Sequence, residues 1–228
     1  MDWKMFGNVR QIGGAVDPVA EVGADAEAQF NRQGELLVAG GSSPYENIVA
    51  AGRAFEVNTG NTTSLDLAAV IAVPTTAVML AIYNGESDGG LSYVIDQAWA
   101  LHTTAAASLA HACLIGVLGT VREALVTDAT PAGALRALNG MGGRNTKARV
   151  VVATTIPAGS GVAANWFAMT PSVGSGVTSL PGLSLIADVN GRIIVPPGRY
   201  FGVHVLASAV GHEFNAGIRW HERQLPLG

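Results

Sequence analysis

Cysteine and charged residues are both scarce in this chain. Its 228 residues include one cysteine, Cys113, so neither an internal disulfide nor a cysteine-based metal cage can form. Asp, Glu, Lys and Arg together make up 13% of the residues, which is about half of the roughly 25% found in typical domains. Because a monomer in water normally covers itself with charge, this shortage indicates that much of the surface is buried against other protein.

Long basic runs and membrane-spanning stretches are missing as well. The formal net charge is -4, so we predict no nucleic-acid partner. The apolar residues 67–83 are interrupted by Pro74, and residues 105–119 are shorter than the ~20 residues of a transmembrane helix, so we predict no membrane partner. We read the first stretch as two strands around a corner, and the second as either a buried helix or a strand. The opening "MDWKMFGNVRQIGG" does not have the pattern of a signal peptide.

Glycine and small residues are abundant, with 29 glycines and 10 prolines. This composition favours short strands joined by turns over long amphipathic helices. "GESDGG" is expected to be a hairpin turn, and "GALRALNG" one helical turn. Strands are predicted in these segments: "GRAFEVNTG", "LDLAAVIAV", "AVMLAIYN", "LSYVIDQAWALHTTA", "KARVVVATTIP", "NWFAMTP", "LSLIADVNG" (ending at its Asn-Gly), Ile193 to Val195, Tyr200 to Ala207 and Phe214 to Gln224.

The first part of the chain differs from the rest. Residues 1–49 have weak periodicity and many Gly and Ala residues, which predicts an N-terminal arm, extended or partly disordered, ahead of a domain at residues 50–228. Trp3, Met5 and Phe6 form an apolar tip. Burying one such side chain is worth about 1.5–3 kcal/mol, so we predict that the tip contacts a partner chain.

Two parts of the chain share one pattern of strands and turns. "VIAVPTTAVMLAIYNGESDGGLSYVIDQAWALH" and "RIIVPPGRYFGVHVLASAVGHEFNAGIRWHE" each predict a strand, a Val-Pro corner, a second strand, a polar turn and a strand with an inward tryptophan, Trp99 or Trp220. Proline cannot donate to a sheet ladder, so each corner should end a strand and lead to the other sheet. In "GRIIVPPGRYFGVHV", Pro196 and Pro197 should end the strand, and Gly198 should permit the bend. The fold class is therefore mainly β, a jelly-roll β-sandwich.

The last strand predicts an inner and an outer face. Because strand side chains alternate, Ile218 and Trp220 should point into the core. Arg219, His221 and Arg223 should then point outward, to solvent or to an interface. We predict that these three residues contact a partner.

The two matching segments, "AVPTTAVMLAIYNGESDGGLSYVIDQAWAL" and "IIVPPGRYFGVHVLASAVGHEFNAGIRWHE", resemble virion structural proteins of tailed bacteriophages that carry a jelly-roll, tumour-necrosis-factor-like domain. The resemblance covers residues 50–224. It implies a non-enzymatic homotrimer, located in the virion, that decorates or cements the particle. Its other partners would be virion proteins such as the major capsid protein.

No residue pattern in the sequence indicates a catalysed reaction, so we predict no catalytic, cofactor-binding or metal-binding residues. His204 and His212 stand as single histidines across a turn, which does not match the His-x-His pattern of a cupin metal site. No Gly-x-Ser-x-Gly element is present either. Two alternatives stay open. One is a carbohydrate- or receptor-binding module of a virion, which should expose a cluster of Trp or Tyr. The other is a cupin-like metalloenzyme, which should bind a transition metal through several histidines.

Overall fold

The computed structural model describes residues 44–59, 67–75, 77–104, 111–119, 135–138, 146–155, 166–173, 183–209 and 211–225. Contacts between residues divide the chain into two units, Met1–Ile48 and Val49–Gly228. Residues 1–43 of the predicted arm lie outside the described residues, and the helix α1 spans Pro44–Ala50. Gly52 follows the helix with a φ of 68° and donates its backbone N–H to the carbonyl of Val49, as glycines commonly do at helix C-termini.

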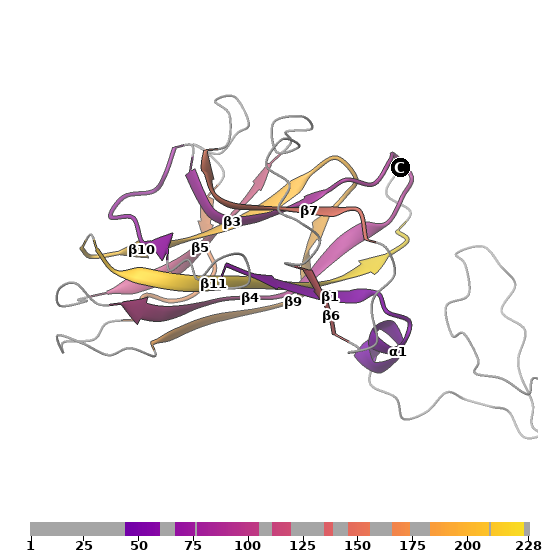
Figure 1. The fold of residues 1–228 in the computed structure, drawn as a ribbon, viewed down its shortest axis with the longest axis horizontal. Helices are drawn as coiled ribbons and strands as arrows, with labels where there is room; N and C mark the ends of the chain where they lie inside the picture. The colour runs from indigo at the N-terminus through magenta and orange to yellow at the C-terminus, as the bar shows by residue number, and fades with distance from the viewer. Residues whose placement is uncertain are drawn as a thin grey trace, which may run out of the picture. The chain divides into compact units, whose positions relative to one another are not determined.

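Val49–Gly228 is mainly β and forms two antiparallel sheets, which Figure 1 shows as two layers. We name each sheet after its central strand. The β11 sheet has the order β6 (Leu135–Ala137), β1 (Ala54–Asn58), β11 (Glu213–Arg223), β4 (Ser92–Thr104), β9 (Ser184–Val195), with β2 (Leu67–Ala68) also pairing β11. The β10 sheet has the order β7 (Ala148–Thr155), β3 (Ala77–Asn84), β10 (Tyr200–Ala207), β5 (Ala112–Gly119), β8 (Trp166–Ala168).

The hydrophobic core lies between the two sheets. Trp220 is fully buried there, and its ring packs against Phe55 and Tyr93 with ring centroids 5.8 and 6.1 Å apart. Ile218 is buried in the same cluster, so the predicted inward face of the last strand is confirmed. The β10 sheet supplies the opposite wall of the core through Leu80, Ile82, Leu114, Phe201, Val203 and Val205.

The β10 sheet is buried on its other face as well. A second apolar cluster there consists of Val78, Ala81, Tyr83, Val117, Val151 and Tyr200, each at most 6% exposed. Strands that are buried on both faces need continuous apolar runs rather than alternation. This explains why "AVMLAIYN" and "YFGVHVLA" show no alternation of apolar and polar residues.

The Pro-Pro-Gly corner carries the chain from one sheet to the other, as predicted. β9 ends at Val195 in the β11 sheet, and β10 begins at Tyr200 in the β10 sheet. Arg199 donates its N–H to the carbonyl of Pro196, and Gly198 has a φ of 74°. A proline at the second position and a glycine with positive φ at the third are typical of a type II turn.

The two similar sequence segments lie side by side, because β3 pairs with β10 and β4 pairs with β11. The prediction that "GESDGG" makes a hairpin was wrong. β3 and β4 belong to different sheets, so Gly85 to Gly90 form a second corner between the layers. Both corners bring the chain from one layer to the other at a polar, glycine-containing turn.

Two other predicted elements differ from the structure, and one ambiguous stretch is resolved. Of the described residues of "LDLAAVIAV", 67–73, a strand forms at Leu67–Ala68, and "GALRALNG" contains the strand β6 instead of a helical turn. β6 pairs with β1, so a ladder to a distant strand decides its conformation. Of the ambiguous residues 105–119, Ala112–Gly119 form the strand β5.

The prediction that the strand "LSLIADVNG" ends at its Asn-Gly pair was wrong, because β9 continues to Val195. Asp188 pairs with Gln97 and Ile193 with Ile95, so the chain between them bulges opposite Asp96 and then returns to β4. Asn190 and Gly191 have positive φ values of 50° and 77°. Two successive residues with positive φ usually form a tight turn that reverses the chain. Here they lie within a bulge, after which the strand continues.

Trp99 does not point into the core, so this prediction was wrong. The register between β11 and β4 shifts at Asp96, because Arg219 pairs with Gln97 but Trp220 pairs with Ile95. One extra residue moves every later side chain of the strand to the other face. The core therefore receives Tyr93 and Ile95 before the shift, and Ala98 and Ala100 after it.

Candidate functional site

The predicted contact residues of the last strand lie on the outer face of the β11 sheet, which is the face turned away from the core. Arg223 is exposed, Arg219 is partly exposed and His221 is 7% exposed. The other predicted contact residues, Trp3, Met5 and Phe6, lie outside the described residues. The orientation of the three β11 side chains follows from strand alternation, but their partners come from distant strands.

A row of polar side chains crosses four strands on this face. Arg219 on β11 donates from Nε to Oε2 of Glu56 on β1 at 3.0 Å, and from Nη1 to Oε1 of Gln97 on β4 at 2.9 Å. Gln97 donates from Nε2 to Oδ1 of Asp188 on β9 at 2.7 Å. Neighbours in the row are also register partners. Cross-strand pairs of this kind contribute about 0.2–1 kcal/mol each, so the row helps to hold the strands in register.

His221 is held by a carboxylate from the β4 bulge. Its Nδ1 lies 3.0 Å from both oxygens of Asp96. Asp96 is the extra residue where β4 changes register against β11. The bulge therefore orients the Asp96 carboxylate toward the imidazole, which fixes the orientation of the ring.

Apolar side chains flank the polar row on β4 and β9. Ile186 is 55% exposed, and Leu101 and Ile194 are each 38% exposed. Trp99 is half-buried and pairs with Ile186 across the two strands. Sequence reasoning missed these residues, because the alternation in "SLIADVNGRIIV" shows two faces without showing which one is covered.

Two histidines form a buried pair inside the sandwich. Nδ1 of His212 lies 3.2 Å from Nε2 of His102, and both side chains are at most 2% exposed. The ring of His102 also packs against Phe214, with centroids 4.8 Å apart. Burial, and secondarily the neighbouring His102, lowers the pKa of His212. His212 is thus accommodated in its neutral form.

The other histidines are spread over the two sheets. His204 is buried beside Trp166, and burial lowers the pKa of His204 despite a backbone hydrogen bond at Val205. His111 is exposed. Within the described ranges, no three His, Cys, Asp or Glu side chains are grouped so that they could hold a metal ion. No helix in the described part of the chain has the length and apolarity to span a membrane.

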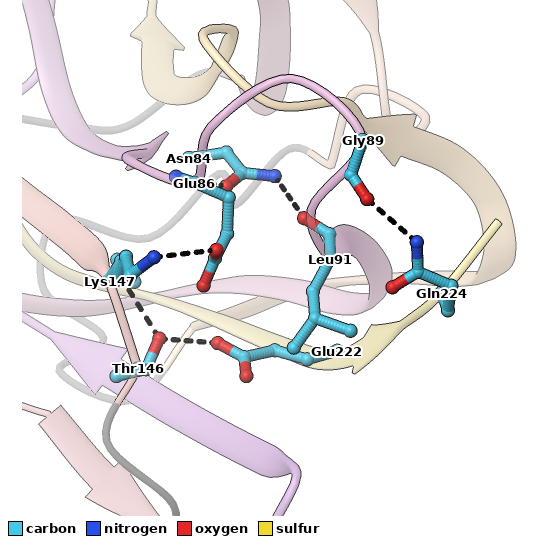
Figure 2. A network of polar contacts seen from close by, with 9 residues as sticks. Asn84, Glu86, Gly89, Leu91, Thr146, Lys147, Glu222 and Gln224 are labelled. Atoms are coloured by element: carbon cyan, nitrogen blue, oxygen red, sulfur yellow. Dashed lines mark hydrogen bonds and ion pairs between the residues drawn. The ribbon is translucent and has the colours of Figure 1, made fainter. Parts of the chain in front are cut away.

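A polar network joins the two corners between the sheets, and Figure 2 shows the part of it around the "GESDGG" corner. Asn84, at the end of β3, is fully buried. Its Nδ2 donates to the carbonyl of Leu91 at 2.8 Å, as Figure 2 shows. The same Nδ2 donates to the carbonyl of Val195 at 2.9 Å, and Oδ1 accepts from the N–H of Glu86 at 3.0 Å. The carbonyl of Asn84 also accepts from the N–H of Gly198. One side chain thereby ties the "GESDGG" corner to the Pro-Pro-Gly corner.

Charged and hydroxyl groups surround this junction. Lys147 forms an ion pair with Glu86 at 3.0 Å, and the Thr146 hydroxyl bonds the carboxylate of the buried Glu222. Burial raises the pKa of the nearby Tyr93 well above its usual range. The network connects the ends of several strands to one another, so these polar groups stabilise the fold.

Comparison with protein-family models, with curated proteins and with solved structures finds no match for this chain.

Proposed function

We propose that this protein is a non-enzymatic structural component of a bacteriophage virion, a homotrimeric jelly roll that decorates or cements the capsid. Its partners are then other copies of itself and virion proteins such as the major capsid protein. The proposal combines the sequence resemblance with the arrangement of strands in the sandwich.

The observation that carries the proposal is the nested pairing of eight strands. Taken in chain order, the eight are β1, β3, β4, β5, β8, β9, β10 and β11. The first pairs with the last, the second with the seventh, the third with the sixth and the fourth with the fifth. A long hairpin rolled into two sheets has this order, which is characteristic of the jelly rolls found in viral capsid proteins.

The surface and the buried polar groups support a structural role. Exposed isoleucines and a leucine border the polar row on the outer face of the β11 sheet. Apolar groups at such positions mark protein interaction sites when they gather. The buried polar residues at the corners bond strand ends to each other, so they serve the architecture of the sandwich.

The oligomeric state tests this proposal directly. Light scattering of the purified chain at micromolar concentration should give a mass that is a multiple of three times the 23.3 kDa chain mass. Incubation with capsid particles that lack the protein should then bring it into the particle fraction during sedimentation. A monomer that also fails to sediment with particles would contradict the proposal.

A further inference from the structure

Among the strands that the structure describes, β9 is a long, exposed edge of the β11 sheet. It has 12 residues, whereas the strand at the opposite edge, β6, has 3. An edge strand offers unpaired backbone groups and side chains to another chain, and short edge strands are one way in which proteins avoid such contacts. Every second residue of β9 is exposed, in the series Ser184, Ile186, Asp188, Asn190, Arg192 and Ile194.

This exposed series is complementary to itself when it is read in the opposite direction. From Ile186 to Ile194 it runs isoleucine, acid, asparagine, base, isoleucine, with Asn190 at its centre. In an antiparallel alignment of two copies about Asn190, Ile186 faces Ile194 of the partner subunit. Asp188 then faces Arg192 of the partner subunit, and both pairs occur twice.

We propose that β9 forms a twofold contact with β9 of a second copy of this chain, with the axis at Asn190. A twofold interface uses the same patch on both subunits, so a surface that takes part must be self-complementary. Charge complementarity and matched apolar residues satisfy that condition on β9. The occupant of this edge is therefore another copy of the same protein.

Asp188 and Arg192 each have one terminal atom that can bind a partner chain in addition to the bonds they make within their own subunit. Asp188 uses Oδ1 to accept from Gln97. Arg192 uses Nε and Nη2 for the carbonyls of Val189 and Asp188. These bonds position the second carboxylate oxygen and Nη1, which form the intersubunit ion pairs. On the neighbouring strand β4, Trp99 and Leu101 lie beside Ile186 and Ser184 of β9 and extend the apolar surface.

Because of the bulge at the centre of β9, the twofold contact is made by side chains on either side of Asn190 and not by an unbroken backbone ladder through it. Asn190 and Gly191, with their positive φ values, interrupt the flat edge midway. Bulges of this kind limit indiscriminate edge pairing. Because the twofold contact occupies the β9 edge of both subunits, it closes on itself and does not propagate through β9.

The twofold contact does not rest on the proposed trimer. If the trimer also forms, β9 links one trimer to another. If the trimer does not form, β9 gives a dimer, and the two proposals can be distinguished by mass.

Charge reversal on β9 tests the contact. Asp188→Arg or Arg192→Asp alone places like charges opposite each other at two places in the interface, which should weaken association by at least about tenfold. Sedimentation velocity should show loss of the twofold-linked species, with a dimer becoming a monomer or a pair of trimers becoming single trimers. The double variant D188R/R192D should restore the wild-type mass. Folded single variants that keep the wild-type mass would overturn the proposal.

A cross-link gives an independent measurement. Asn190→Cys in a Cys113→Ser background places a thiol at the axis, next to its copy in the partner, where the Cα separation of about 4.4–6.8 Å needed for a disulfide can be met. Oxidation should yield a covalent dimer. The matched control is Ser172→Cys, an exposed position away from β9. Equal dimer yields from both cysteines, or none from Asn190→Cys, would overturn the proposal.

Discussion

Two glycines in this sandwich are covered by the aromatic ring that faces them on the neighbouring strand. Gly217 pairs with Trp99, and Gly119 pairs with Tyr200. A Cβ on Gly217 would lie 2.2 Å from Cε2 of Trp99, and one on Gly119 would lie 2.0 Å from Cε1 of Tyr200. Both distances are far shorter than any van der Waals contact, so each ring requires glycine opposite it.

Substitution of Gly217 by alanine should therefore destabilise the protein. The new methyl group would push the Trp99 ring off the β11 strand, which should lower the free energy of unfolding by about 1–3 kcal/mol. Urea unfolding monitored by tryptophan fluorescence measures the change.

The double variant Trp99→Ala, Gly217→Ala provides the control. With the ring removed, alanine at position 217 meets no obstacle, and its cost should largely disappear. A Gly217→Ala penalty of equal size in both backgrounds would mean that the ring is not its cause.

At the scale of elements, the molecule depends on two corners that move the chain between sheets. Asn84 bonds to both of them, through the carbonyls of Leu91 and Val195. Its backbone N–H also donates to the carbonyl of Arg199, just beyond the Pro-Pro-Gly turn. Strand ends that come from distant parts of the chain thus share one buried amide.

Asn84→Leu should strongly destabilise the sandwich. The replacement has similar size but leaves two carbonyls without their donor, and an unsatisfied buried group costs about 1–3 kcal/mol. We expect a loss of at least about 2 kcal/mol in the free energy of unfolding, measured by chemical denaturation.

Gln224→Ala is the matched control in the same network. Gln224 donates to the carbonyl of Gly89 at 2.7 Å in an exposed position, so its removal should change stability by no more than about 0.5 kcal/mol. If the two variants were equally stable, Asn84 would not be the tie between the corners.

At the scale of the whole molecule, the buried neutral histidines couple stability to pH. Burial lowers the pKa of His212 and of His204 below their ordinary value. The unfolded chain binds protons at these residues near pH 6.5, before the folded chain does. Stability is therefore retained above that pH and declines as the pH falls below it.

Unfolding in urea at pH 7.5, 6.5 and 5.5 and one protein concentration should reveal this decline. Each histidine contributes a slope of up to about 1.4 kcal/mol per pH unit. His212→Gln should flatten the dependence, because the variant has one group fewer to protonate. His111→Gln, at an exposed position, should leave the slope as it is in the wild type. Identical slopes for His212→Gln and the wild type would contradict the assignment.

The sequence alone determined the features that depend on neighbouring residues. Strand alternation placed Ile218 and Trp220 inward and Arg219, His221 and Arg223 outward. Proline and glycine located the corner at residues 196–198, because their effect on φ acts within one or two residues. The two-sheet architecture followed from these local signals, since short apolar strands separated by such corners must pack as layers.

Tertiary structure decided everything that depends on register between distant strands. The bulge at Asp96 turned Trp99 outward, and pairing with β1 made a strand of Leu135–Ala137. The partners of Arg219 and His221 are likewise set by which strands lie beside β11. A side chain's face depends on a count of residues along the ladder, and one inserted residue reverses it. Such a count is fixed only when the strands pair, and therefore cannot be read from the residues around the site.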